Sequence, residues 1–205
     1  MQPAVPGTTF LLVRHAQTVW NQEQRHSGSS EVALSPVADQ QIAQLTRRLL
    51  GEPISALYTS PLSRCVLTVQ PTADILGLSP VVCDDLKERS LGTWEGLGPK
   101  QLAPAHPGYR FPQSAYNDDF QIPGAEPLKE FEWRIREFLR VASARHPGET
   151  VLVSTHSGVI WTMLCRLVAH PLAEPGWPSN CSLHIVRGSA RSFALASSEA
   201  GLPID

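Results

Sequence analysis

The sequence has little cysteine and no long hydrophobic run. Its longest apolar stretches, such as residues 10–13 and 151–153, are far shorter than the roughly 20 residues that cross a bilayer, so we predict no membrane span. The N-terminus lacks the basic start of a secretory signal, which favours a cytoplasmic protein. The four cysteines are widely spaced and form no C-x-x-C pair, which favours reduced, buried thiols over a disulfide framework or a zinc site.

The sequence also lacks an excess of charge of one sign. Seventeen basic and nineteen acidic residues give a formal net charge of −2, and neither sign gathers into a block. Nucleic acid and anionic membranes attract basic clusters, so we predict neither as a partner and leave a homodimer open. A chain of 205 residues with 42% hydrophobic and 18% charged residues is typical of one globular domain, here residues 1–205.

What the sequence does contain is an alternation of short strands and helices. Apolar runs rich in β-forming residues predict strands at 8–13, 54–59, 81–83, 150–154, 182–186 and 192–196. Helical spacing or capping signals predict helices at 34–50, 61–77, 127–145 and 158–168, the second of them capped by Ser60 and ended by Gly77. The pattern predicts an α/β three-layer sandwich, with a mostly parallel central sheet flanked by helices.

One segment, at about residues 97–125, shows no clear period and is rich in glycine, proline and aromatic residues. We predict that it covers the active site. Two interpretations of the aromatic side chains in and beside it stay open: they form an apolar wall for the substrate, or they pack a long loop. The residues concerned are Trp94, Tyr109, Phe111, Tyr116 and Phe120.

Histidine and arginine gather at the predicted strand ends. His15 and His156 each follow a strand, Arg14 precedes His15, and Arg64 lies within one helical turn of another strand end. Ligands of such sheets bind outside the carboxyl ends of the strands. A planar guanidinium suits phosphoryl oxygens, and a neutral imidazole can attack phosphorus. One such histidine alone favours a scaffold role, but the four together predict an anion pocket that contains a nucleophile.

Several motifs in this order resemble the histidine phosphatase superfamily, branch 1, which includes cofactor-dependent phosphoglycerate mutases and fructose-2,6-bisphosphatases. Residues 12–21 read LVRHAQTVWN, which is similar to the signature L-V-R-H-G-x-T-x-W-N, and residues 25–28 read RHSG. The matches continue with SPLSR at 60–64, LKERSLGTWEG at 86–96 and THSG at 155–158. Ala16 and Ser157 stand where the family usually has glycine, and both are small enough that we expect the chemistry to survive.

The resemblance implies a role for each matched residue. His15 would be the nucleophile that becomes phosphohistidine, with Arg14, Arg64 and His156 around the phosphoryl oxygens. Glu88 would donate a proton to the leaving oxygen, although without the resemblance a solvated loop carboxylate beside Asp84, Asp85 and Glu95 would be the favoured interpretation. Further substrate-binding residues would be Asn21, Ser27, Gly28, Thr18 and Ser157. The resemblance implies no metal and no cofactor.

The function implied is hydrolysis of a small phosphate ester through a phosphohistidine. A mutase of this family would carry E-R-H-Y-G where residues 88–92 read ERSLG, and would need extra cations, whereas residues 97–122 offer only Lys100 and Arg110. A second alternative is a phosphate- or phosphopeptide-binding module without catalysis. The presence of His15, Glu88 and His156 counts against it, because binding needs neither a nucleophile nor an acid.

Overall fold

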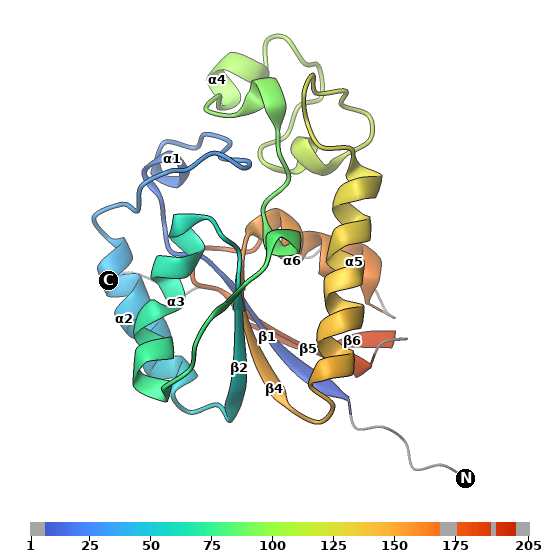
Figure 1. Cartoon of the computed structure of the whole chain (residues 1–205). Coiled ribbons are helices and arrows are strands. Elements are labelled where there is room, and N and C mark those ends of the chain that lie inside the picture. Colours follow the sequence, from blue (N-terminus) through green and yellow to red (C-terminus); the bar gives the residue numbers. More distant parts are fainter. Residues whose placement is uncertain (1–6, 169–175, 190–191, 200–205) are drawn as a thin grey trace.

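The computed structural model describes residues 7–168, 176–189 and 192–199. Its centre is a six-stranded sheet in the order β3-β2-β4-β1-β5-β6 (Figure 1). Neighbouring strands among β3, β2, β4 and β1 pair in parallel, and β5 runs antiparallel to both β1 and β6. The predicted mostly parallel sheet is therefore confirmed. The strands are β1 Thr8–Arg14, β2 Ile54–Thr59, β3 Val81–Val82, β4 Thr150–Thr155, β5 Leu183–Ser189 and β6 Ser192–Glu199.

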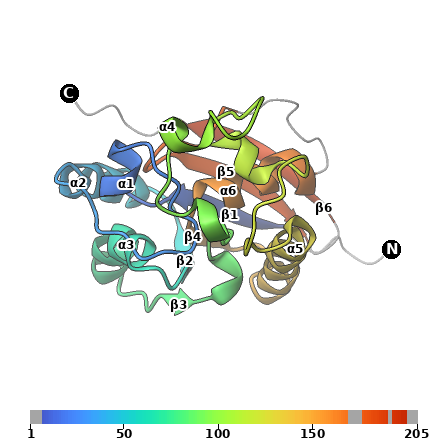
Figure 2. The same cartoon turned by 90° about the horizontal axis from the view of Figure 1, so that it is seen from above.

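Helices cover both faces of the sheet. α2 and α3 lie on one side, and α5 lies on the other (Figures 1 and 2). The α-helices are α1 Val19–Gln22, α2 Ala38–Leu49, α3 Ser63–Leu76, α4 Pro99–Leu102, α5 Leu128–Arg145 and α6 Ser157–Thr162. A π-helical turn, Met163–Leu167, continues α6, and short 3-10 helices occur at Asp84–Leu86, Gly92–Trp94 and Gln113–Tyr116. No helix of the described residues is long and apolar enough to cross a membrane.

The alternation of side chains along β1 explains the three layers. Phe10 and Leu12 pack into a core with Phe131 and other residues of α5, whereas Leu11 and Val13 join a second core with α2 and α3. These four side chains of β1 are fully buried. Because both faces of the strand need apolar cover, helices are required on both sides. Each such side chain contributes about 1.5–3 kcal/mol when it leaves water.

The start of α3 differs from the prediction. Leu62 is extended, with ψ of 131°, so the helix begins at Ser63, and Ser60 with Pro61 lies outside it. The Ser60 hydroxyl instead lies 2.8 Å from Nε2 of His156. Capping by Ser60 was therefore wrong, because a tertiary contact occupies the side chain that the local pattern assigns to the helix. The predicted end is confirmed, since Gly77 takes the left-handed conformation, with φ of 65°.

Residues 97–125, which we call the roof, contain only short helices and lie beyond the carboxyl ends of the central strands (Figure 1). Aromatic contacts hold the roof together. The Trp94 ring lies 5.0 Å from that of His106, 5.6 Å from Tyr109 and 5.8 Å from Phe120, measured between ring centroids. Three of the five aromatic residues in question thus pack the loop itself, and the other two are described with the site.

Candidate active site

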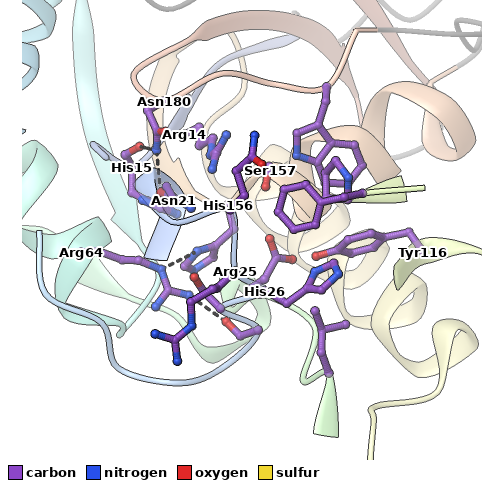
Figure 3. Close-up of a pocket in the computed structure, with 18 residues that line it drawn as sticks. Arg14, His15, Asn21, Arg25, His26, Arg64, Tyr116, His156, Ser157 and Asn180 are labelled. Carbon is purple, nitrogen blue, oxygen red and sulfur yellow. Dashed lines mark hydrogen bonds between the residues drawn. The ribbon is translucent and has the colours of Figure 1, made fainter. Parts of the chain in front are cut away.

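A cavity of about 220 Å³ lies between the strand ends and the roof (Figure 3). The register of the sheet brings its two histidines together, because Arg14 at the end of β1 pairs with Thr155 at the end of β4. Nine of the ten predicted site residues line the cavity: Arg14, His15, Asn21, Ser27, Gly28, Arg64, Glu88, His156 and Ser157. The remaining walls come from Gln24, Arg25, His26, Leu91, Phe111, Pro112, Tyr116, Trp177 and Asn180.

His15 is held in one tautomer. Its Nδ1 lies 2.7 Å from the carbonyl oxygen of Ala16, and a carbonyl only accepts, so Nδ1 carries the proton. Nε2 therefore keeps its lone pair. Burial, followed by the nearby positive charges of Arg64 and Arg14, lowers the pKa of His15 well below its usual range. The ring is thus neutral at physiological pH and able to act as a nucleophile.

Arg64 is anchored by protein atoms on all three guanidinium nitrogens. Its Nη1 donates to the carbonyl oxygen of Ser30 at 2.7 Å, Nη2 to that of Gly28 at 2.8 Å, and Nε to Nδ1 of His156 at 3.3 Å. Each terminal nitrogen carries a second hydrogen. Arg64 therefore has further donors in a fixed orientation, which suits the oxygens of a phosphoryl group.

Arg14 is less completely paired. Its Nη1 donates to the carbonyl oxygen of Pro178 at 2.7 Å. Burial lowers the pKa of Arg14 to about 10, so it stays charged at neutral pH. Its Nε and the Oγ of Ser27 are buried and have no hydrogen-bond partner among the described residues, where the only other such side-chain atom is Oε1 of Gln44. Buried polar atoms without partners are costly, and an anion in the cavity would pair both.

His156 completes the floor of the cavity. Its Nδ1 accepts from Arg64, so Nε2 carries the proton and lies 2.8 Å from the Ser60 oxygen. The His156 ring lies edge-on to that of His15, with centroids 5.2 Å apart. Burial, then Arg64 and His15, lower the pKa of His156 well below its usual range. Two neutral histidines therefore lie between two charged arginines.

Glu88 lies inside the cavity wall rather than in solvent. Its Oε1 accepts from the backbone N–H of Arg89 at 3.0 Å, and its Oε2 accepts from that of Gly158 at 2.9 Å. Burial raises the pKa of Glu88 in spite of these hydrogen bonds. The carboxyl group therefore holds a proton to higher pH than an exposed glutamate, as a proton donor requires.

The acidic neighbours of Glu88 have other surroundings. Asp84 is mostly exposed and pairs with Lys87 at 2.9 Å, and it does not line the cavity. Glu95 accepts from the backbone N–H of Ser29 at 3.0 Å and of Leu91 at 2.9 Å. Burial raises the pKa of Glu95, but the hydrogen bonds, with Ser30 first, lower it overall. Glu95 thus connects the loop at 27–30 to the loop after Glu88, a role that the motif did not reveal.

Gly28 is the glycine that this arrangement requires. Its φ is +51°, and a Cβ there would overlap the Glu95 carboxylate. Its carbonyl oxygen receives the hydrogen bond from Arg64. A larger residue would therefore disturb both the loop and the arginine.

Thr18 is the one predicted site residue that does not line the cavity. Its hydroxyl accepts from the backbone N–H of Asn21 at 3.2 Å and caps α1. The structure therefore does not place the Thr18 hydroxyl among the groups that line the cavity. Oδ1 of Asn21 accepts in turn from the Thr18 N–H and from Nδ2 of Asn180, which also donates to the His15 carbonyl oxygen. Asn21 is thus fixed with its own amide nitrogen left for a ligand.

The upper wall of the cavity is apolar. Phe111 and Tyr116 line it from the roof, and Trp177 lines it from the segment before β5. Trp177 was not among the predicted site residues. Neither was His26, which lines the cavity with its ring 4.8 Å from that of Phe111 and its Nε2 2.8 Å from the Tyr109 hydroxyl. Burial lowers the pKa of His26 to about 4, so this ring is neutral too.

The arginines that line the cavity are Arg14, Arg25 and Arg64, and none of them belongs to the roof. The roof supplies no lysine or arginine to the lining, and Arg110 lines a different hollow. Arg25, which the sequence analysis assigned no role, reaches the cavity while it stacks on Trp20 and pairs with Glu23. Among the described residues, no three His, Cys, Asp or Glu side chains gather as a possible metal site.

The chain belongs to the histidine phosphatase superfamily, branch 1, whose family model matches residues 10–200. It is 35% identical over 168 residues to phosphoglycerate mutase-like protein 4 of Arabidopsis thaliana, covering 80% of this chain and 72% of that protein. It is 30% identical over 174 residues to phosphoserine phosphatase 1 of Hydrogenobacter thermophilus, with 84% and 81% covered. The structure of YhfR from Bacillus stearothermophilus superposes with a TM-score of 0.81 at 27% identity, over 96% and 98% of the two chains. The predicted histidine phosphatase family is confirmed.

Proposed function

We propose that this protein hydrolyses a small phosphate ester through a phosphohistidine on His15. The observation that carries the proposal is the unprotonated Nε2 of a neutral His15, in the same cavity as two buried arginines and a carboxyl group with a raised pKa. Nucleophile, anion site and acid then share one cavity. Relatives named as phosphoserine phosphatases support the same class of reaction.

In the first step, the Nε2 lone pair attacks phosphorus and the ester P–O bond breaks. The leaving oxygen takes the proton from Glu88, which becomes a carboxylate. Arg14 and Arg64 stabilise the charge on the three transferring oxygens. In the second step, Glu88 removes a proton from water, the water oxygen bonds to phosphorus, and the N–P bond breaks. Inorganic phosphate leaves, and His15 and Glu88 return to their starting states.

The roof favours a hydrolase over a mutase. A mutase has to hold a bisphosphate, which needs cations beyond the first phosphate site. Lys100 and Arg110 of the roof lie outside the cavity lining, and Arg25 is the one arginine or lysine besides Arg14 and Arg64 among the described residues that line it. A binding module without catalysis would need no tautomer-fixed nucleophile and no buried acid. We therefore rank hydrolysis first, with mutase activity second.

The proposal is tested by a rapid quench of the enzyme with a radiolabelled ester. We expect an acid-labile, base-stable label on His15 and stoichiometric release of inorganic phosphate from a panel that includes phosphoserine and sugar phosphates. Label without phosphate release, but with transfer to a second alcohol, would favour the mutase. Ligand binding without label would favour the binding module. A cytoplasmic location and a homodimer stay predictions, open to cell fractionation and to light scattering.

A further inference from the structure

The roof reaches the proposed acid through one side chain, Tyr116. Its hydroxyl points into the cavity (Figure 3) and lies beside Gly158, whose backbone N–H donates to Oε2 of Glu88 at 2.9 Å, so the hydroxyl and the carboxyl group interact. Glu88 thus accepts from the backbone N–H groups of Arg89 and Gly158 and interacts with the Tyr116 side chain. Only the tyrosine partner is a side chain, so it is the one that a substitution can remove.

Tyr116 is held firmly in place. It ends the short helix Gln113–Tyr116, and its ring packs 5.2 Å from that of Trp177 and 6.0 Å from that of Phe131, between centroids. Arg89, the residue after Glu88, donates to the carbonyl oxygen of Ala115. The loop that carries the acid and the segment that carries the tyrosine are thus tied together twice.

Gly158 gives the tyrosine its room. A Cβ on Gly158 would overlap both the ring and the hydroxyl of Tyr116. The same glycine donates its N–H to Glu88. The close approach of the hydroxyl to the carboxylate therefore depends on the absence of a side chain at this position.

We propose that Tyr116 is a positioning residue for Glu88, whose hydroxyl orients the carboxyl group and stabilises the carboxylate that remains after proton donation. The inference rests on the proposed function, because it assigns Tyr116 a role only through Glu88. Tyr116 keeps its own proton throughout: burial and then the Glu88 charge raise its pKa well above the usual range. The tyrosine is thus a hydrogen-bond donor to the carboxylate and takes no part in proton transfer.

The charged groups around Glu88 determine in which direction its pKa should change when the Tyr116 hydroxyl is removed. Arg14 from β1, Arg64 from α3 and the adjacent Arg89 interact with it electrostatically, and Arg134 from α5 donates to its carbonyl oxygen at 3.3 Å. The hydrogen bond from Tyr116 adds to these in lowering the pKa of Glu88. Loss of the hydroxyl should therefore raise that pKa and leave the acid less well oriented.

The test is Tyr116→Phe, with Tyr58→Phe as the matched control, since the Tyr58 hydroxyl is also hydrogen-bonded but contacts His146. For an alkyl phosphate, we expect the plateau of kcat/KM to fall by about tenfold in Tyr116→Phe, a fraction of what a general acid supplies. The decline of kcat/KM at high pH should begin at a higher pH in Tyr116→Phe than in the wild type. Phosphorylation by p-nitrophenyl phosphate should change little, and Tyr58→Phe should match the wild type with both esters. A lower plateau with an unmoved pH profile would overturn the inference.

A double mutant separates this inference from the proposed function. If Tyr116 acts through Glu88, Tyr116→Phe should cost nothing further in the Glu88→Gln background. Additive losses would refute the positioning role while leaving the phosphohistidine mechanism intact. Absence of a phosphoenzyme in the wild type would instead refute the proposed function.

Gly158→Ala supplies a second route if Tyr116→Phe does not fold. It displaces the hydroxyl without removing the backbone N–H that Glu88 accepts from. We expect the same selective loss with the alkyl ester. Equal losses with both esters would argue against the inference.

Discussion

The floor and the roof of the cavity are built in opposite ways. In the floor, charged and polar side chains are fixed by hydrogen bonds, as Arg64 is by the carbonyl oxygens of Gly28 and Ser30 and His156 is by Arg64 and Ser60. The roof instead packs its aromatic rings around Trp94, which lies just before it in the chain. The floor therefore suits the phosphoryl group that all phosphate esters share, and the roof meets only the leaving group.

This division also separates charge from shape. In the proposed mechanism, Arg14 and Arg64 in the floor bind any phosphoryl dianion. Phe111 and Trp177 can select a leaving group only by size and apolar contact. Tyr116 is where the two regions meet, since it belongs to the roof and contacts the acid of the floor. Four further experiments probe the comparison, beginning with the floor.

Replacement of His15 should have the largest effect. We expect His15→Ala to lower turnover by on the order of 10⁴ or more with every ester and to abolish phosphoenzyme labelling, because it removes the Nε2 lone pair that attacks phosphorus in the proposed mechanism. Quench-flow labelling measures this. His146→Gln is the control, since His146 lies away from the cavity and contacts Tyr58 and Glu149. Substantial labelling of His15→Ala would place the nucleophile elsewhere.

Replacement of Glu88 should depend on the leaving group. An alkyl oxygen needs a proton to depart and a nitrophenolate does not, so Glu88→Gln should slow an alkyl phosphate by on the order of 10² and p-nitrophenyl phosphate much less. Burial raises the pKa of Glu88, so wild-type kcat/KM for the alkyl ester should fall only as pH rises through that raised value. The variant should lack this fall.

The exposed Asp84 offers the control for that experiment. Asp84→Asn should behave as the wild type with both esters, because its side chain pairs only with Lys87 at the surface. Equal losses with both esters in Glu88→Gln would mean that Glu88 supports the site structurally, and the proton donor would have to be sought elsewhere.

A change in the roof should alter selectivity more than chemistry. We expect Phe111→Ala to raise KM about three- to tenfold for esters with bulky apolar leaving groups, since it removes apolar contact from one wall. For the smallest esters, kcat should stay within about twofold, because the floor is untouched. Steady-state kinetics across an ester series measure this. A uniform loss of kcat would contradict the division between floor and roof.

Chelation should have the smallest effect. The phosphoryl charge is met by Arg14 and Arg64, so we expect full activity after exhaustive dialysis against a chelator. The check is phosphate release before and after dialysis, with and without added divalent ions. Loss of activity that a divalent ion restores would require a different catalytic apparatus.

Local sequence predicted the framework well. The strands at 54–59 and 150–154 and the helix over 127–145 appear within a residue or so of their expected bounds, because their apolar periodicity matches the buried faces. His15, Arg14 and His156 follow strand ends directly, so their common edge could be inferred from the parallel order. Ser60 and Thr18 show the limit, since each has a hydroxyl that serves a contact other than the expected one.

The sequence by itself determined the order of strands and helices, the residues at the strand ends and, through its motifs, the family. Only the tertiary structure decided which groups are neutral, which aromatic rings face the substrate, and that Tyr116 meets Glu88 beside Gly158. The physical reason is the separation along the chain over which each kind of interaction acts. Backbone propensity and hydrophobic period act over a few residues, whereas burial, hydrogen bonding and pKa depend on atoms brought together from distant parts of the chain.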